Sequence, residues 1–136
     1  MILSSPLYYD TMTENEISGV LVNIFLRIHR SLGPGLLESV YEEVICYELS
    51  KEGISHKRQH HIRVFYEGVE MDLGFRADVI VDEKVIVEVK SVETLLPLHH
   101  KVLLTYLKLS NIKLGLLVNF NVELIKNGIH RLANKL

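Results

Sequence analysis

The residues of this chain whose types and spacing could carry out chemistry are Asp78, Glu88 and Lys90. They lie in the segment 78–90 (DVIVDEKVIVEVK), whose valine-rich halves predict a β-hairpin that turns at residues 82–84. Because strand side chains alternate between two faces, Glu88 and Lys90 share one face, and pairing of Val81 with Val85 sets Asp78 directly opposite Glu88. The other face is expected to be apolar and to consist of Ala77, Val79, Val81, Val85, Val87 and Val89.

Two carboxylates that face each other on paired strands repel, so this arrangement needs a compensating charge. Oxygen ligands that converge on one point suit a hard cation such as Mg²⁺ or Mn²⁺. Lys90 could then stabilise an attacking hydroxide or the charge that grows on a phosphoryl group. The alternative is a solvated polar strand face on which Lys90 neutralises Glu88. The spacing alone leaves the metal site and the solvated face equally open.

A third carboxylate could come from Glu38, near the start of a helix expected over residues 36–51. On this helix Glu38 shares a stripe with Tyr41, Glu42 and Ile45, at spacings i, i+3, i+4 and i+7. A carboxylate in the first turn also stabilises a helix N-terminus, and by itself that role is the better explanation of Glu38. The buried side of the helix is expected to be a different stripe, formed by Leu37, Val40, Val44 and Tyr47 or Leu49.

Two further helices are expected around these strands. The first begins with a capping box between Thr13 and Glu16, continues with apolar residues at helical spacing, and ends at residues 33–35 (GPG). The last starts at Pro97, which suits a first helical turn, and covers residues 97–110. This last helix is apolar on most of its faces, so we expect it to be largely buried.

The expected strands form a mixed sheet. Residues 55–90 predict three antiparallel strands, with the first turn at Glu67-Gly68. The apolar run of residues 112–118 predicts a strand covered on both faces, and the helix before it implies a parallel neighbour. Asn127-Gly128, between two apolar segments, is typical of a type I′ hairpin. The sequence therefore predicts an α/β fold, with a mixed four-stranded sheet flanked by helices and a short C-terminal hairpin.

Composition limits the class of protein. With 136 residues, 48% of them hydrophobic, the chain fits one globular domain, expected over residues 12–136 behind an N-terminal extension of residues 1–11. A net charge of −2 gives no overall attraction for nucleic acid, so such a partner would need a local basic patch. The single cysteine, Cys46, and the lack of a signal-like or membrane-spanning apolar run predict a cytoplasmic protein without a membrane partner.

Several motifs along the chain resemble those of a known family. In sequence order they are Gly35-x-x-Glu38-x-x-Tyr41, Gly74-Phe75-Arg76-Ala77-Asp78, Glu88-Val89-Lys90 and Leu103-Leu104-Thr105-Tyr106-Leu107-Lys108. Together these motifs are similar to those of the small GxxExxY proteins, which belong to the PD-(D/E)XK nuclease-like superfamily. The similarity runs from about Met12 to the C-terminus, so it covers nearly the whole chain.

This resemblance implies a restriction-endonuclease-like fold and a nuclease that hydrolyses phosphodiester bonds of DNA or RNA with Mg²⁺ or Mn²⁺. It also implies a metal site formed by Asp78, Glu88 and the Val89 carbonyl, with Glu38 in support and Lys90 as the catalytic lysine. Further candidates for contact with the substrate are Tyr41, Tyr106, Arg76 and His29.

One position departs from the family pattern. Members usually carry a glutamine four residues before the tyrosine of the third helix, whereas here Val102 stands four residues before Tyr106. The loss of this polar contact leaves open a catalytically inactive nuclease-fold module that binds nucleic acid or a protein partner. A structural homodimer is a third alternative, because the apolar third helix could bury a face against a second copy.

The histidines and basic residues allow other interpretations. The segment 56–63 (HKRQHHIR) is a basic stripe that could contact a phosphate backbone or protect the edge of a sheet. A zinc site is not favoured, because the strand neighbours His60 and His61 point to opposite faces. The helix neighbours His99 and His100 lie about 100° apart around the helix axis, which does not suit a shared ligand either.

Overall fold

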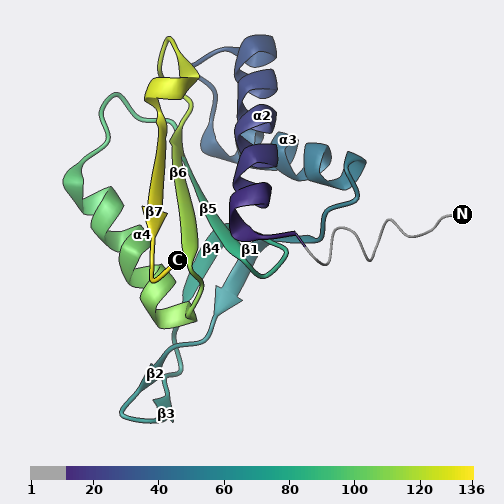
Figure 1. Cartoon of the computed structure of the whole chain (residues 1–136). Helices are drawn as coiled ribbons and strands as arrows, with labels where there is room; N and C mark the ends of the chain where they lie inside the picture. The colour runs from purple at the N-terminus through teal and green to yellow at the C-terminus, as the bar shows by residue number, and fades with distance from the viewer. Residues whose placement is uncertain (1–11) are drawn as a thin grey trace, which may run out of the picture.

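A five-stranded mixed sheet with helices on both faces organises residues 12–136, the part of the chain that this computed structural model describes (Figure 1). The expected extension, residues 1–11, lies outside the described residues. In pairing order, the strands are β1 (His56–Ile62), β4 (Phe75–Val81), β5 (Val85–Lys90), β6 (Leu114–Asn119) and β7 (Ile129–Ala133). All neighbours are antiparallel except β5 and β6, which are parallel. The predicted α/β fold is confirmed, with five strands in the sheet rather than four.

Two helices cover one face of the sheet and one helix covers the other. The helices α2 (Glu14–Leu32) and α3 (Glu38–Lys51) lie on the first face, and α4 (Pro97–Ser110) lies on the second (Figure 1). The α2–α3 side holds the larger hydrophobic core, and a smaller cluster lies beneath α4. No helix in residues 12–136 is both long and apolar enough to cross a membrane.

The capping box expected at the start of α2 is present. The Thr13 hydroxyl accepts the Glu16 N–H at 3.1 Å, and the Glu16 carboxylate accepts the Thr13 N–H at 2.8 Å. The helix stops at Gly33, whose φ of 71° suits a residue without a Cβ. One apolar stripe of α2 faces the sheet, and its buried members are Ile17, Leu21, Ile24, Phe25 and Ile28.

The buried stripe of α3 agrees with the prediction at Leu49, which is fully buried, and at Val44, which packs against the core, but not at the other predicted positions. Leu37, just before the helix, is 74% exposed, and Val40 and Tyr47 are exposed as well. The residues that face the sheet are Tyr41, Glu42, Ile45 and Leu49. Tyr41 sets this orientation, because its ring stacks on Phe120 with ring centres 4.3 Å apart and its hydroxyl donates to a carbonyl of the turn after α2. The stripe of α3 that contains Tyr41, Glu42 and Ile45 therefore faces the sheet, and Glu42 is buried there.

α4 is less buried than its composition predicts. Of its residues only Leu103 and Leu107 are buried, and they pack with sheet residues such as Ile80 and Ile86. The apolar side chains that stay exposed on this helix are Leu98, Val102 and Leu109. The prediction failed because, among the residues described, no second helix packs over the outer side of α4. A homodimer through this face stays a prediction.

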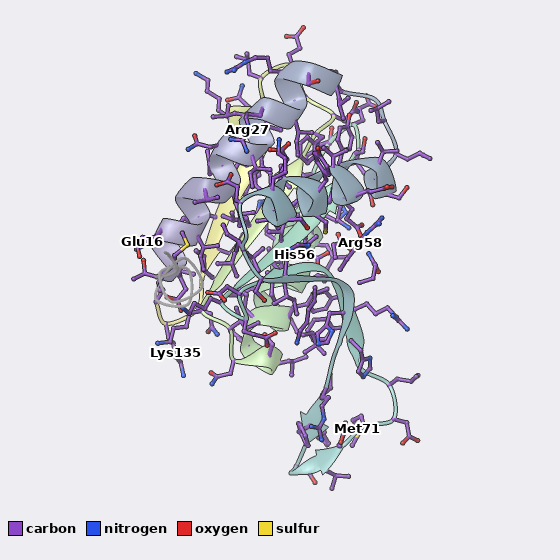
Figure 2. The ribbon with its side chains drawn as sticks, turned by 90° about the vertical axis from the view of Figure 1, so that its right-hand side faces the viewer. Glu16, Arg27, His56, Arg58, Met71 and Lys135 are labelled. Atoms are coloured by element: carbon purple, nitrogen blue, oxygen red, sulfur yellow. The ribbon has the colours of Figure 1, made fainter. Side chains whose placement is uncertain are left out.

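Residues 55–90 form five strands instead of three, because a two-stranded ribbon is inserted between β1 and β4. The ribbon consists of β2 (Phe65–Tyr66) and β3 (Val69–Glu70), which pair only with each other and project away from the sheet in Figure 1. Met71, just after β3, lies on this projecting part in Figure 2. The predicted turn at Glu67-Gly68 is confirmed, and both residues have positive φ, 52° and 79°.

The hairpin of β4 and β5 has the predicted register, in which Val81 lies opposite Val85. Its apolar face is shorter than predicted, because Ala77 belongs to the cluster beneath α4 whereas Val79 belongs to the α2–α3 core. The side-chain alternation of β4 is therefore interrupted at Asp78, the residue between them. This interruption gives Asp78 an orientation that the simple alternation of a strand does not predict.

The predicted type I′ hairpin at Asn127-Gly128 is wrong. Ile125–Asn127 form a short 3₁₀ helix, and Gly128 has a φ of −101°, whereas a type I′ turn needs positive φ at both central residues. Glycine is required at this position for another reason, because a Cβ on Gly128 would lie 2.2 Å from the Asn119 carbonyl oxygen. The segment after the turn pairs with β6 and becomes the fifth strand of the sheet.

Candidate metal centre

Asp78 and Glu88 meet where β4 and β5 stop pairing. The last antiparallel pair between these strands is Val79 with Val87. Beyond it, the Val89 N–H donates to Asp78 Oδ2 at 2.8 Å, and the Asp78 N–H donates to Glu88 Oε1 at 3.4 Å. Side-chain carboxylates thus replace backbone carbonyls as acceptors. Because these side chains accept the backbone N–H groups, the carboxylates of Asp78 and Glu88 lie together where the two strands stop pairing.

Burial makes this pair of carboxylates electrostatically unfavourable. Glu88 is 8% exposed, and burial together with the Asp78 carboxylate raises the pKa of Glu88 to about 8. Burial also raises the pKa of Asp78, although the hydrogen bond from Val89 opposes this shift. Near neutral pH the pair therefore retains a proton on Glu88 when no other charge neutralises it. A divalent cation could replace that proton.

The backbone of Val89 offers a third oxygen. The Lys90 carbonyl accepts the Phe120 N–H at 2.9 Å, so the backbone of Lys90 faces β6 and the strand that follows it. Because backbone groups alternate along a strand, the N–H and C=O of Val89 point the opposite way, toward Asp78. Two carboxylates and a carbonyl are the ligands that Mg²⁺ takes from proteins, with water in the remaining positions. The residues present therefore fit this metal.

A cavity of about 170 Å³ opens beside Glu88, between β5 and α4. The polar residues that line it are Glu88, Lys90, His99 and Tyr106. Val102 adds apolar surface at the position where the GxxExxY proteins usually carry a glutamine. The Tyr106 ring stacks on Phe75 with ring centres 3.8 Å apart, and burial and the nearby carboxylates raise the pKa of Tyr106. The structure thus brings Lys90 and Tyr106 to the same cavity as Glu88.

Glu38 lies near this centre but is not grouped with its carboxylates. It is the first residue of α3, and its Oε2 accepts the N–H of Ser91, the residue after Lys90, at 3.1 Å. It lines a separate hollow of about 510 Å³ together with Ser91 and Asn121. Within residues 12–136, no three His, Cys, Asp or Glu side chains are grouped to hold a metal ion. Glu38 is therefore not a third carboxylate beside Asp78 and Glu88.

A second network, which the sequence pattern did not single out, reaches Asp78 from the α3 side. Glu42 is 5% exposed, and its Oε1 accepts hydrogen bonds from Gln59 Nε2 at 2.8 Å and Arg58 Nε at 3.1 Å. The same Gln59 nitrogen donates to Asp78 Oδ1 at 3.2 Å. The signal in the sequence was the position of Glu42 one turn after Glu38, on the same helical stripe.

The other candidates for substrate contact occupy different environments. Tyr41 is fully buried and its hydroxyl is bound to the turn after α2, while buried His29 donates to a carbonyl in the loop after β6 at 2.7 Å. Neither side chain faces the two carboxylates, so the structure gives both of them a role in packing. Arg76 is exposed on β4 and donates to the Gln59 carbonyl at 3.2 Å. Arg76 and Tyr106 remain candidates for contact with the substrate.

The basic stripe lies on β1, an edge strand of the sheet, and on the residue that follows it. Figure 2 shows Arg58 beside α3, where it also donates to the Ser39 carbonyl at 3.1 Å. The cations of the stripe pair with acidic residues of the chain itself, Arg58 with Glu42, Lys57 with Glu83 and Arg63 with Glu70. This pairing favours a charged edge strand over a free phosphate-binding stripe.

The comparisons with known proteins bear on the chain as a whole. No match was found among curated proteins, and none among solved structures. The family model of the PD-(D/E)XK nuclease superfamily matches residues 15–132, a range that includes Asp78, Glu88 and Lys90. The narrower likeness to the GxxExxY proteins stays a resemblance. Because the match covers nearly the whole chain, this protein belongs to the PD-(D/E)XK nuclease superfamily.

Proposed function

We propose that this protein is a nuclease that hydrolyses phosphodiester bonds of DNA or RNA with Mg²⁺ or Mn²⁺. The observation that carries the proposal is the buried, opposed pair of Asp78 and Glu88, in which burial and then the charge of Asp78 raise the pKa of Glu88 to about 8. A protein that folds two like charges together loses stability unless a cation compensates them. Asp78, Glu88 and the Val89 carbonyl are the proposed metal ligands.

The residues around the pair fit the steps of hydrolysis. A bound Mg²⁺ would lower the pKa of a water ligand and polarise the phosphate. Lys90 lines the same cavity as Glu88, and this supports a role for its ammonium group in stabilising an attacking hydroxide or the negative charge that grows on the phosphate. Tyr106 lines this cavity as well, and we assign Tyr106 and Arg76 to contacts with the substrate.

Glu38 has a supporting role in this proposal. Its Oε2 already accepts the Ser91 N–H, which ties the start of α3 to the end of β5 immediately after Lys90. The second carboxylate oxygen is available to a water molecule. We therefore assign Glu38 to the orientation of a water bound to the metal rather than to direct coordination.

The alternative function is a nuclease-fold module that binds nucleic acid or a protein without cleaving it. Val102 favours this alternative, because an apolar side chain lines the cavity where the family pattern places an amide. In that case the carboxylate pair could still bind a cation, but the substrate would lack a polar contact beside it. Binding and cleavage must therefore be measured separately.

The test is Mn²⁺-dependent cleavage of single-stranded, duplex and structured DNA or RNA by the wild type and by Asp78→Ala and Lys90→Ala variants. Asp78→Ala is expected to remove both cleavage and the Mn²⁺-dependent rise in the thermal midpoint. Lys90→Ala is expected to keep that rise and to lower the cleavage rate by roughly 100-fold or more. Lys101→Ala, at an exposed lysine of α4, is the matched control and should behave as wild type.

Three results would overturn parts of this proposal. A wild type that binds Mn²⁺ and nucleic acid but cleaves nothing would favour the non-catalytic module. A wild type whose thermal midpoint does not respond to Mn²⁺ or Mg²⁺ would remove the metal centre itself. Equal cleavage by wild type and Lys90→Ala would remove the assigned role of the lysine.

A further inference from the structure

Gln59 has an unusual backbone for a residue inside a strand. Its φ is 50°, in the left-handed region, although it lies in the middle of β1. Within residues 12–136, every other non-glycine residue with positive φ lies in a turn, at a helix end or next to the C-terminus. A left-handed glutamine costs energy and persists only where the surrounding structure enforces it. Residues with such strained backbones gather at functional sites, so we looked for a function of Gln59 in its contacts.

The irregularity lies directly across from Asp78. β1 and β4 pair regularly from His56 with Val81 to Arg58 with Val79, and again from His60 with Ala77. The pair that is missing from this register is Gln59 with Asp78. The interruption of β4 at Asp78, where Ala77 and Val79 pack into different clusters, therefore coincides with the left-handed residue on β1.

The side chain of Gln59 connects two carboxylates. Its amide nitrogen donates to Asp78 Oδ1 at 3.2 Å and to Glu42 Oε1 at 2.8 Å, one hydrogen for each acceptor. Glu42 is a fixed anchor, because it is almost fully buried and also accepts a hydrogen bond from Arg58.

Both oxygens of Asp78 are consequently held by donors. Oδ1 accepts the Gln59 amide and Oδ2 accepts the Val89 N–H, so the plane of the carboxylate is defined. The side chain of Glu88 is hydrogen-bonded to Asp78 as well, and because a carboxylate oxygen accepts about two hydrogen bonds, Asp78 would have lone pairs for a cation that replaces the proton of Glu88. Gln59 on β1 and Val89 on β5 together therefore fix the orientation of the Asp78 carboxylate and of its lone pairs.

We propose that Gln59 is a positioning residue of the metal centre, and that its left-handed backbone serves to aim the carboxylate of Asp78 at the cation. The inference rests on the proposed function in so far as Asp78 binds a metal. The glutamine acts from outside the ligand set, as groups that hydrogen-bond metal ligands do in other sites. It also supplies a side-chain amide near the centre from a strand, whereas Val102 provides none from α4.

The test compares Gln59→Gly with wild type. Glycine accepts the left-handed backbone at no steric cost, so the variant removes the amide without straining the strand. We expect the thermal midpoint without metal to be unchanged or higher, and the Mn²⁺ dissociation constant from calorimetric titration to rise about 10- to 100-fold. Glu67→Gly is the matched control, because Glu67 also has positive φ but lies in the turn of the β2–β3 ribbon.

A second measurement separates this inference from the proposed function. The amide of Val89 donates to Asp78, so its hydrogen exchange reports on the position of that carboxylate without any metal. In Gln59→Gly, exchange at Val89 should become faster, while exchange at Val87, inside the regular hairpin, should stay as in wild type. Gln59→Asn, which tolerates the left-handed backbone but is one methylene shorter, should give the same pattern if the glycine variant does not fold.

The outcomes distinguish the two ideas. If wild type binds Mn²⁺ and Gln59→Gly binds it equally well, the positioning role fails and the metal centre stands. If Val89 exchange does not change, the claim that Gln59 holds Asp78 fails whatever the metal does. If wild type binds no Mn²⁺, the proposed function fails. The claim that Gln59 directs Asp78 toward a cation then fails too, even if hydrogen exchange at Val89 becomes faster in Gln59→Gly.

Discussion

Two glutamates on neighbouring hairpins have opposite electrostatic environments. Glu70, on β3, is exposed and faces Arg63, which donates two hydrogen bonds to it at 2.8 and 2.9 Å and lowers its pKa. Glu88, on β5, is buried and faces Asp78, and its pKa is raised to about 8 by burial and by that carboxylate. The β2–β3 ribbon therefore carries an exposed pair of opposite charges, whereas the β4–β5 hairpin carries a buried pair of like charges.

This difference distinguishes a structural ion pair, Arg63 with Glu70, from a candidate functional site, Asp78 with Glu88. The charges of the ribbon satisfy each other within the chain, so nothing external is needed to neutralise them. The like charges of the β4–β5 hairpin are relieved by a proton on Glu88, and a cation from solution would relieve them as well. A fold that keeps such a pair in its central sheet gives up stability at this place, and the cation that we propose would recover the loss on binding.

The largest effect is expected from Glu88→Gln, which keeps the shape of the side chain and removes its charge. At neutral pH, without metal, the free energy of unfolding should rise by about 2–3 kcal/mol, because the folded protein no longer has to protonate a carboxyl that ionises freely when unfolded. The same variant should lose the stabilisation by Mn²⁺. Urea denaturation with and without Mn²⁺ measures both changes. An apo protein that becomes less stable would mean that the pair is a favourable structural contact, like that of the ribbon.

The same shift in the pKa of Glu88 should make the stability of the metal-free protein depend on pH. Between pH 4.5 and about 8 the folded protein keeps a proton on Glu88 that the unfolded chain has lost. Because the folded state binds more protons in this range, the free energy of unfolding should fall as pH rises, by at most about 1.4 kcal/mol per unit, and then level off above pH 8.

The affinity for Mn²⁺ should rise over the same range, since the cation replaces the proton. Denaturation and calorimetric titration at several pH values give both profiles. The Glu88→Gln variant is the control for the stability profile, which should become much flatter. A wild-type profile that rises from pH 4.5 to 8 would contradict the raised pKa.

The sequence predicted the central hairpin because its signals are local. Alternating valines set the faces of the strands, and the turn at residues 82–84 sets the register, so the pairing of Val81 with Val85 could be predicted from spacing alone. The capping box of α2 and the parallel strand after α4 were predicted for the same reason. Each of these signals lies within a short stretch of chain.

What the sequence could not predict depends on contacts between elements. The buried face of α3 was misassigned because both of its stripes carry apolar residues, and the stacking of Tyr41 on a distant phenylalanine decides between them. The bridge from Glu42 through Gln59 to Asp78 joins a helix and two strands, and it depends on a left-handed residue that no local pattern marks. Glu38 was linked to the carboxylates by motif, whereas in the structure Ser91 binds it.

The smallest effect is expected from Arg63→Ala in the ribbon. Its ion pair with Glu70 is exposed to water, where such pairs contribute little to stability, and Glu70 left alone would remain well solvated. The variant should therefore keep the wild-type thermal midpoint, Mn²⁺ affinity and rate of nucleic-acid cleavage. Unchanged Mn²⁺ affinity with weaker binding of nucleic acid would have a specific meaning. The ribbon would then be part of the surface that holds the substrate, and its charges would serve function just as those of the central hairpin do.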